Sequence, residues 1–150
     1  MSTIEYQCLE GLPDADILAE IVAINQTIFG FNETEENLHQ CFSEHQKLLI
    51  CMAYQDGRLV GFKVGFEREP RSFESWRGGV LESARRQGIA AELMRLQHDW
   101  CQAHNFRVIQ TTTNSDNIGM LMVNLQSGFE IIGSFVNRNK RLKLLQEKYL

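Results

Sequence analysis

The sequence predicts one mixed α/β domain, and three observations support that prediction. The chain has 150 residues, of which 43% are hydrophobic, so it can bury one core, and no linker or low-complexity stretch divides it. Segments with the two-residue period of strands alternate with segments that have the 3.6-residue period of helices. Residues 78–91 join a strand end, a glycine-bearing turn and a helix start in one run. The resulting order, β-α-α-β-β-β-α-β-α-β-β, intersperses helices through a sheet.

The first third of the chain predicts a short strand followed by two helices. Residues 4–9 alternate as a strand does, and Gly11 ends the run. Asp14 is a suitable N-cap for a helix whose apolar residues keep helical spacing as far as Gly30. Thr34 can cap a second helix.

The middle third predicts three strands and a helix with a long apolar stripe at helical period. Residues 47–54 and 58–67 are apolar and β-prone, and the Asp-Gly pair between them is a strong hairpin signal. Residues 73–81 resume the strand pattern and lead through the glycine turn into a helix that ends near His104.

The last third predicts a strand, a short helix and a closing hairpin. The strand covers residues 106–113, which are rich in Val, Ile and Thr. The helix follows the capping cluster 114–117 and stops at Gly128. The hairpin consists of residues 129–136 and 141–149.

The run at residues 78–91 has the properties of an anion-binding turn. The helix after it carries an apolar stripe at helical period, so its first turn is expected close to Arg86 and Gln87. The first N–H groups of a helix have no acceptor within the helix and carry the positive end of its dipole. Gly88 allows a close backbone approach, and Ala90 keeps the surface low. The alternative is a tight strand-to-helix turn that binds nothing.

The six residues from Arg85 to Ala90, Arg-Arg-Gln-Gly-Ile-Ala, resemble the (Arg/Gln)-x-x-Gly-x-(Gly/Ala) signature of the GNAT superfamily of acyl-CoA-dependent N-acyltransferases. The elements from Phe73 to Phe129 also follow that family's order and spacing, whereas the first third of the chain is only compatible with it. The resemblance implies a GNAT-like fold, in which a mixed, mostly antiparallel sheet of about seven strands is splayed between strands 4 and 5 and packed with about four helices.

The resemblance also implies acetyl-CoA as a cosubstrate, lying in the cleft between the strands at 73–81 and 106–113. A bulge that opens this cleft is expected at the adjacent Gly78 and Gly79 of the strand at 73–81. Asn117 would contact the cofactor arm, or would simply cap its helix, and both roles are compatible. The implied cofactor-binding residues are Gly78, Gly79, Val80, Arg85, Arg86, Gln87, Gly88, Ile89, Ala90, Ala91 and Asn117.

Glu74 is the general base that the resemblance implies, because an acceptor ammonium must lose its proton before it attacks a thioester. The two-residue period places Glu74 on the same face as Gly78 and Val80, unless a bulge intervenes. The alternative is a solvated carboxylate, with water as the base. Two other carboxylates, Glu67 and Glu82, are less well placed to act as the base. A surface ion pair explains Glu67, and Glu82 lies beside the anion-binding turn, at the wrong end for amine chemistry.

Asn124 occupies the position at which many family members carry a tyrosine that protonates the departing thiolate. An amide can donate a hydrogen bond but cannot release a proton at neutral pH. A thiolate with a pKa of about 8.5 is a tolerable leaving group, so the loss of a general acid need not abolish transfer. Asn124 is therefore expected either to stabilise the sulfur or to face solvent.

These observations lead to an enzyme that transfers an acetyl group from acetyl-CoA to a primary amine of a small molecule or a peptide by direct attack. A catalytically silent acyl-CoA-binding or regulatory domain is the alternative, because Asn124 replaces the tyrosine and the base is uncertain. The sequence does not disclose the acceptor. A homodimer is compatible with the family, in which dimers are common, but the sequence does not decide the oligomeric state.

Composition argues against several other classes of protein. The net charge of −4 and the dispersed basic residues argue against nucleic-acid binding. No signal peptide or membrane segment is evident, so a cytoplasmic location is expected. The four histidines lack metal-ligand company, and His98 in particular is expected on a helix flank. The four cysteines, without a C-x-x-C pair, are expected to be small buried hydrophobes in a reducing compartment.

Overall fold

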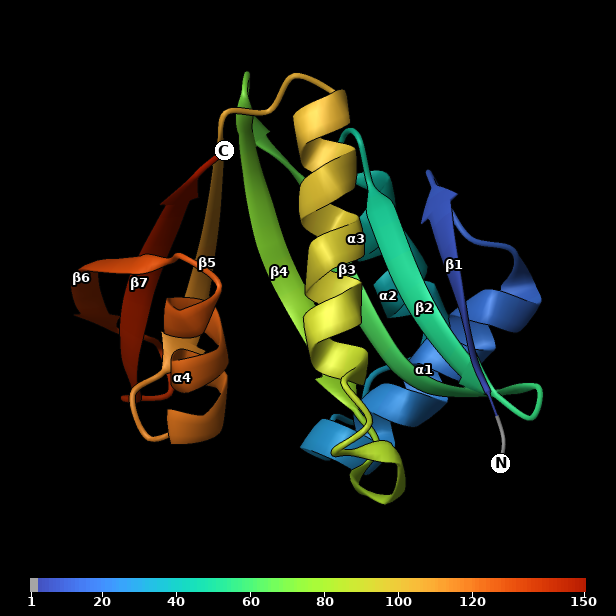
Figure 1. Ribbon diagram of the computed structural model, residues 1–150. Helices are drawn as coiled ribbons and strands as arrows, with labels where there is room; N and C mark the ends of the chain where they lie inside the picture. Colours follow the sequence, from blue (N-terminus) through green and yellow to red (C-terminus); the bar gives the residue numbers. More distant parts are fainter. Residues whose placement is uncertain (1–2) are drawn as a thin grey trace.

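A seven-stranded sheet forms the centre of the computed structural model, which describes residues 3–150 (Figure 1). The strand order is β1-β2-β3-β4-β5-β7-β6, and neighbouring strands are antiparallel except for the parallel pair β4 and β5. The strands are β1 (Ile4–Glu10), β2 (Leu49–Gln55), β3 (Arg58–Glu69), β4 (Ser72–Val80), β5 (Val108–Asn114), β6 (Glu130–Val136) and β7 (Leu142–Tyr149).

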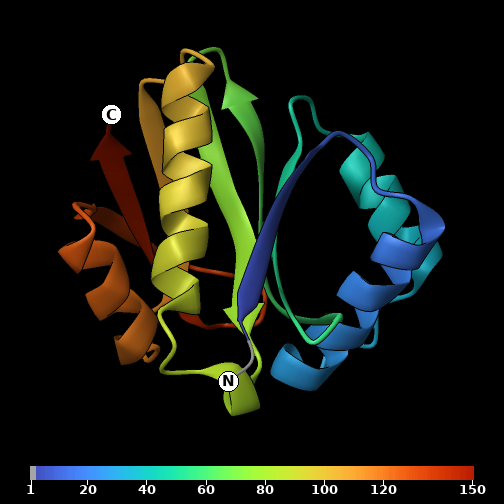
Figure 2. The same ribbon diagram turned by 45° about the vertical axis from the view of Figure 1, so that its right-hand side comes forward.

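Helices cover both faces of the sheet, as Figure 2 shows from the side. The helices are α1 (Ala15–Phe29), α2 (Glu35–Ser43), α3 (Ile89–Ala103) and α4 (Ile118–Gln126). α1 and α2 pack on one face, while α3 and α4 lie on the other. None of the helices within residues 3–150 combines the length and the apolar run needed to cross a membrane. The predicted mixed α/β class, with a mostly antiparallel sheet and four helices, is confirmed.

The first two helices begin where their capping residues predict. Asp14 accepts a hydrogen bond at Oδ1 from Ile17 N (2.9 Å), and Thr34 accepts one at Oγ1 from Asn37 N (3.1 Å). Gly30 ends α1 in the left-handed conformation with φ 71°, which glycine adopts without strain.

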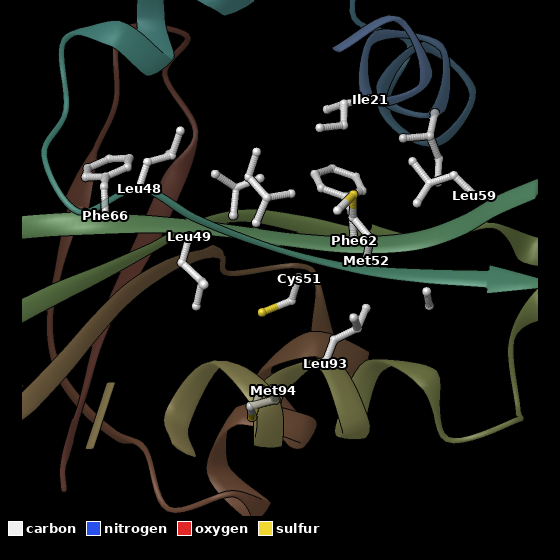
Figure 3. Close-up of a cluster of buried hydrophobic side chains, with 14 of the residues drawn as sticks. Ile21, Leu48, Leu49, Cys51, Met52, Leu59, Phe62, Phe66, Leu93 and Met94 are labelled. Atoms are coloured by element: carbon white, nitrogen blue, oxygen red, sulfur yellow. The ribbon is translucent and has the colours of Figure 1, made fainter. Parts of the chain in front are cut away.

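The core has two layers because the central strands are buried on both faces (Figure 3). Phe62 and Met52 point toward α1, where Ile21 meets them. Cys51 points the other way, toward Leu93 and the rest of α3. A strand buried on both faces cannot alternate apolar and polar residues, which explains the continuous apolar run of β2.

Two cysteines depart from the expected burial. Cys51 and Cys101 are buried, but Cys8 is exposed on β1, which forms an edge of the sheet, and Cys41 is half-buried. All four are free thiols. The short-range apolar context of Cys8 and Cys41 predicted burial wrongly, because burial at an edge strand or a surface helix depends on distant elements.

The sheet opens between β4 and β5, and a β-bulge marks the point of opening. Val64 pairs with Arg77 and Gly65 pairs with Ser75, so Trp76 is an extra residue on β4. The parallel pairing of β4 with β5 runs only from Ser72 to Ser75, where Ser75 O accepts a hydrogen bond from Thr111 Oγ1 (2.9 Å). The predicted splay is confirmed.

The position of the bulge was predicted wrongly. It lies at Trp76 rather than at Gly78 and Gly79, which stay paired with Lys63 and Phe62 of β3. Glycine is required at these two positions for another reason, because a side chain there would collide with neighbouring atoms. A Cβ on Gly78 would lie 2.9 Å from Phe62 O, and one on Gly79 would lie 3.0 Å from the side chain of Ile28.

Gly65, opposite the bulge, offers a test of this packing. A Cβ at this position would strike the Phe73 ring and lie 2.6 Å from the backbone oxygen of Glu74. We expect Gly65→Ala to lower the free energy of unfolding by about 1–3 kcal/mol, because overpacking forces the strands apart. Urea denaturation measures the change. Gly133→Ala on β6 is the matched control, since its Cβ would meet nothing within 4 Å; equal stability of the two variants would contradict the account.

Candidate active site

A cleft of about 880 Å³ lies on the α3 and α4 side of the sheet, below the point at which β4 and β5 separate. Its walls come from α3 and α4, and its remaining lining comes from β3, β4, β7, the end of α1 and the turn between β4 and α3. This volume is in the range of small-molecule and cofactor sites. Nearly all the predicted cofactor-binding residues line it, namely Gly78, Gly79, Val80, Arg85, Arg86, Gly88, Ile89, Ala90, Ala91 and Asn117.

The turn between β4 and α3 presents unpaired backbone donors to one end of the cleft. A short 3-10 turn at Glu82–Ala84 comes first, and Gly88 then caps α3 in the left-handed conformation, with φ 75°. The first helical hydrogen bond runs from Glu92 N to Gly88 O (3.0 Å). The N–H groups of Ile89, Ala90 and Ala91 therefore have no acceptor within the helix and are free to donate to an anion.

α3 starts at Ile89, two to three residues after the predicted first turn near Arg86 and Gln87. The apolar stripe was expected to begin a turn close to Arg86 and Gln87, but Arg86 has φ 67° and lies outside the helix. A left-handed residue cannot continue a right-handed helix. The pair of left-handed residues, Arg86 and Gly88, instead turns the chain from the 3-10 segment into α3.

The side chains around this turn divide into two groups. Arg85 lines the cleft and donates from Nε to Val80 O (3.3 Å), and the exposed Arg86 also lines it. Gln87 does not line the cleft; its amide donates to Ala84 O (3.1 Å) and accepts from Gln55 (3.4 Å). Of Gln87, only the backbone can serve the predicted cofactor site.

Asn117, the N-cap of α4, and Asn124, within α4, have separate environments. Asn117 caps α4, accepting at Oδ1 from Met120 N (3.2 Å), and also lines the cleft, so both predicted roles fit its position. Asn124 is buried, and its amide nitrogen donates to Gln146 Oε1 (2.9 Å) and Thr113 Oγ1 (3.3 Å).

The burial of Asn124 overturns the expectation that it faces solvent. Both of its amide hydrogens are committed to Gln146 and Thr113, so it holds no free donor for a sulfur atom. Its network joins α4 to β5 and β7, and satisfied buried networks of this kind fix the positions of the elements they join. Sequence could not show this, because Gln146 and Thr113 are distant in the chain.

Glu74 lies on the opposite face of the sheet from the cleft. It pairs directly with Phe66, whose side chain lies on the α1 and α2 face, whereas Gly78 pairs with Lys63 on the α3 face. The expectation that Glu74 shares a face with Gly78 and Val80 is wrong, because the extra residue at the bulge reverses the alternation between them.

The surroundings of Glu74 alter its acidity. The side chain is half-buried, and burial raises the pKa of Glu74 to about 7, against an opposing effect from Arg68. A carboxyl with this pKa is partly ionised near neutral pH and can accept a proton. The two other carboxylates differ: Glu67 forms an ion pair with Lys47 (3.0 Å), and Glu82 is exposed in the 3-10 turn.

Three cleft residues escaped prediction from sequence. Lys63, His98 and Lys148 come from β3, α3 and β7 and meet in the cleft, where Lys148 Nζ lies 3.1 Å from His98 Nδ1. His98 was expected on a helix flank, and it is instead 7% exposed and lines the cleft. One sequence signal was available for Lys63, which is the only charged residue in the otherwise apolar run 59–66.

Comparison with known proteins identifies the family of this chain. The sequence profile of the acetyltransferase (GNAT) family matches residues 18–129. The chain belongs to the GNAT acetyltransferase family. No curated protein sequence matches it significantly.

Solved structures of acetyltransferases share the fold of this GNAT protein at low sequence identity. Ard1 from Thermoplasma volcanium has a TM-score of 0.81 and 18% identity over 97% of each chain. The ribosomal-protein-alanine N-acetyltransferase from Brucella melitensis has a TM-score of 0.76 and 20% identity over 99% of each chain. A chain of the NatC complex bound to Gag peptide and CoA has a TM-score of 0.81 and 17% identity over 98% of each chain.

A second, smaller cavity of about 310 Å³ lies at the far end of α3 and includes His45, Lys47 and His104. His104 contacts Glu10 there, with 3.6 Å between Nε2 and Oε1. The described residues contain no group of three or more His, Cys, Asp or Glu side chains arranged to hold a metal ion.

The raised pKa of Glu74 predicts how stability depends on pH. Between the ordinary carboxyl value of 4.5 and about 7, the folded chain keeps a proton that the unfolded chain has lost. The free energy of unfolding should therefore fall as pH rises through this window. We expect Glu74→Gln to match the wild type below about pH 5 and to exceed it by about 1–2 kcal/mol at about pH 8, allowing for solvent screening.

Urea denaturation at several pH values measures this difference. Glu5→Gln on β1 removes an exposed carboxylate and serves as the control for net charge. A difference between Glu74→Gln and the wild type that stays constant across the whole pH range would contradict the assignment.

Proposed function

We propose that this GNAT protein is an N-acetyltransferase that moves the acetyl group of acetyl-CoA to a primary amine of a small molecule or a peptide by direct attack. The single observation that carries the proposal is the start of α3 at one end of the cleft. There, three backbone N–H groups without helical acceptors meet two arginine side chains. This combination suits the pyrophosphate of a CoA ester.

The rest of the cleft fits the arm of the same cosubstrate. Beyond the bulge, β4 has lost its pairing with β5, so the backbone of Gly78 and Val80 can bond to a ligand as if to another strand. Leu81 N donates to Val60 O of β3 (2.8 Å). Because N–H groups alternate along a strand, the N–H groups of Gly78 and Val80 both point away from β3. Gly78 lies farther from the turn and pairs with Lys63, so its N–H is the better placed donor for the thioester oxygen.

Glu74 supplies the base in this proposal. An alkyl ammonium has a pKa near 10, so it must give up a proton before its nitrogen attacks the thioester carbon. The amine would approach from the α1 and α2 face, where Glu74 lies, and the acyl-CoA from the α3 and α4 face. The opening between β4 and β5 is where the two can meet. The nitrogen–carbon bond forms, the carbon–sulfur bond breaks and the proton passes to Glu74 or to water.

The names of two structural neighbours suggest which amines to try as acceptors. The structural neighbours from Brucella melitensis and in the NatC complex are named for a ribosomal-protein alanine and for a bound peptide. These names make peptide amines the first acceptors to try. The second candidate function, a silent acyl-CoA-binding domain, is favoured by one observation: the amide of Asn124 is wholly engaged and leaves the usual proton donor unreplaced at that position.

Turnover with an amine panel separates the two functions. We expect release of CoA thiol from acetyl-CoA with at least one amine among peptides, lysine and polyamines, at a rate that rises as pH increases through about 7, because only the ionised Glu74 accepts a proton. Glu74→Gln should lower kcat by about 10²–10⁴-fold without changing the affinity for acetyl-CoA. Glu67→Gln, which removes an ion-paired carboxylate of β3, is the control and should retain activity.

Each outcome has one meaning. Binding of acetyl-CoA without turnover on any amine would favour the silent domain over the enzyme. Full activity of Glu74→Gln would remove Glu74 from the role of base while leaving the transferase function in place.

A further inference from the structure

The floor of the cleft carries positive charge that no acidic side chain balances. Lys63 and Lys148 both line it, and the ammonium of Lys63 has no hydrogen bond or ion pair within the described chain. Asp99 is the one acidic residue among the described residues of the lining, and its carboxylate is paired with Arg95 (2.8 Å). Burying an unpaired ammonium such as that of Lys63 is costly, which indicates that an anion completes this part of the cleft.

The side chain of Lys63 is directed across β4 by the glycine opposite it. A Cβ on Gly78 would lie 3.3 Å from Lys63 Cγ, so the aliphatic stem of Lys63 covers the space that a side chain would fill. Burial lowers the pKa of Lys63 to about 8, which shows how poorly the site solvates the ammonium. The absence of a side chain at Gly78 thus allows Lys63 to reach the same cleft as the β4 backbone.

His98 adds a buried donor to the same place. Lys148 can only donate, so His98 Nδ1 accepts from it and the neutral ring carries its proton on Nε2. Burial and the nearby ammonium groups of Lys148 and Lys63 lower the pKa of His98 to about 3, which keeps the ring neutral. Nε2 is buried and has no partner in residues 3–150, although His98 lines the cleft. An N–H is costly to leave buried without a partner, so a ligand that reached it would be favoured.

The position of this cluster separates it from the phosphate turn. His98 lies nine residues after Ile89 on α3, which places it about 14 Å along the helix axis from the unpaired N–H groups. An acyl-CoA whose pyrophosphate occupies the turn would therefore bring its opposite end, the thioester, toward the cluster. At this distance Lys63, His98 and Lys148 do not contact a pyrophosphate bound at the turn, so such a contact does not explain the positive charge of the two lysines.

We propose that Lys63, His98 and Lys148 form an anion subsite that binds a negatively charged group at the thioester end of an acyl-CoA. The proposal rests on the proposed function in one respect, since it requires a CoA ester in the cleft. Two groups share the required chemistry. One is a carboxylate at the end of a dicarboxylic acyl group, and the other is the thiolate of CoA that remains after acyl transfer.

The test compares four ligands by calorimetry. Acetyl-CoA and desulfo-CoA, in which hydrogen replaces the thiol, have a neutral end; succinyl-CoA carries a carboxylate there, and CoA can carry a thiolate. We expect succinyl-CoA to bind at least tenfold tighter than acetyl-CoA, or CoA at least tenfold tighter than desulfo-CoA, and whichever pair shows the advantage identifies the anion. Lys63→Met and Lys148→Met should each reduce that advantage at least fivefold.

Lys143→Met is the matched control, since Lys143 lies on the same strand as Lys148, does not line the cleft and has the same charge. It should keep the full advantage. Lys63→Met removes a poorly solvated charge, so it should fold at least as stably as the wild type. If all four ligands bind and neither anionic member gains over its neutral counterpart, the anion subsite is wrong while the proposed function stands. If no ligand binds, the proposed function fails first.

Discussion

The structure depends on one irregularity, the extra residue at Trp76 on β4. It limits the pairing of β4 with β5 to Ser72–Ser75, so the two parallel strands separate and leave the backbone of β4 open. A regular strand would have kept its hydrogen bonds and closed the sheet. The opening has a cost in unmade sheet bonds, which a ligand can offset by pairing with the free edge.

The same bulge assigns the two halves of the proposed reaction to opposite faces of the sheet. Glu74, before the bulge, lies on the α1 and α2 face, and Gly78, after it, lies on the α3 face where the cleft is. The base and the cosubstrate can then meet only through the splay. Burial raises the pKa of Glu74 to about 7, and the unpaired helix N–H groups at the far end of the cleft are suited to negative charge. Each group is thus set by its local surroundings, while the bulge sets where the groups stand.

Much of this could be predicted from sequence, because the signals are local. Capping at Asp14 and Thr34, the hairpin at the Asp-Gly pair and the strand-turn-helix order at residues 78–91 depend on residues close in the chain. The register of β4 was not predictable, since two adjacent glycines look like a bulge, and only the pairing with β3 shows that Trp76 is the extra residue. Lys148 and the partners of Asn124 were also out of reach, because strands far apart in sequence bring them together.

Backbone amide NMR during a titration with acetyl-CoA tests the central claim most directly, namely that the turn and the open edge of β4 form one cofactor site. The account predicts the largest shifts at Gly88–Ala91 and at Gly78–Val80, together and with one affinity. It also predicts their loss in Gly88→Glu, which adds negative charge at the turn and strain at a left-handed residue. Shifts confined to other surfaces, or unchanged binding by Gly88→Glu, would contradict it.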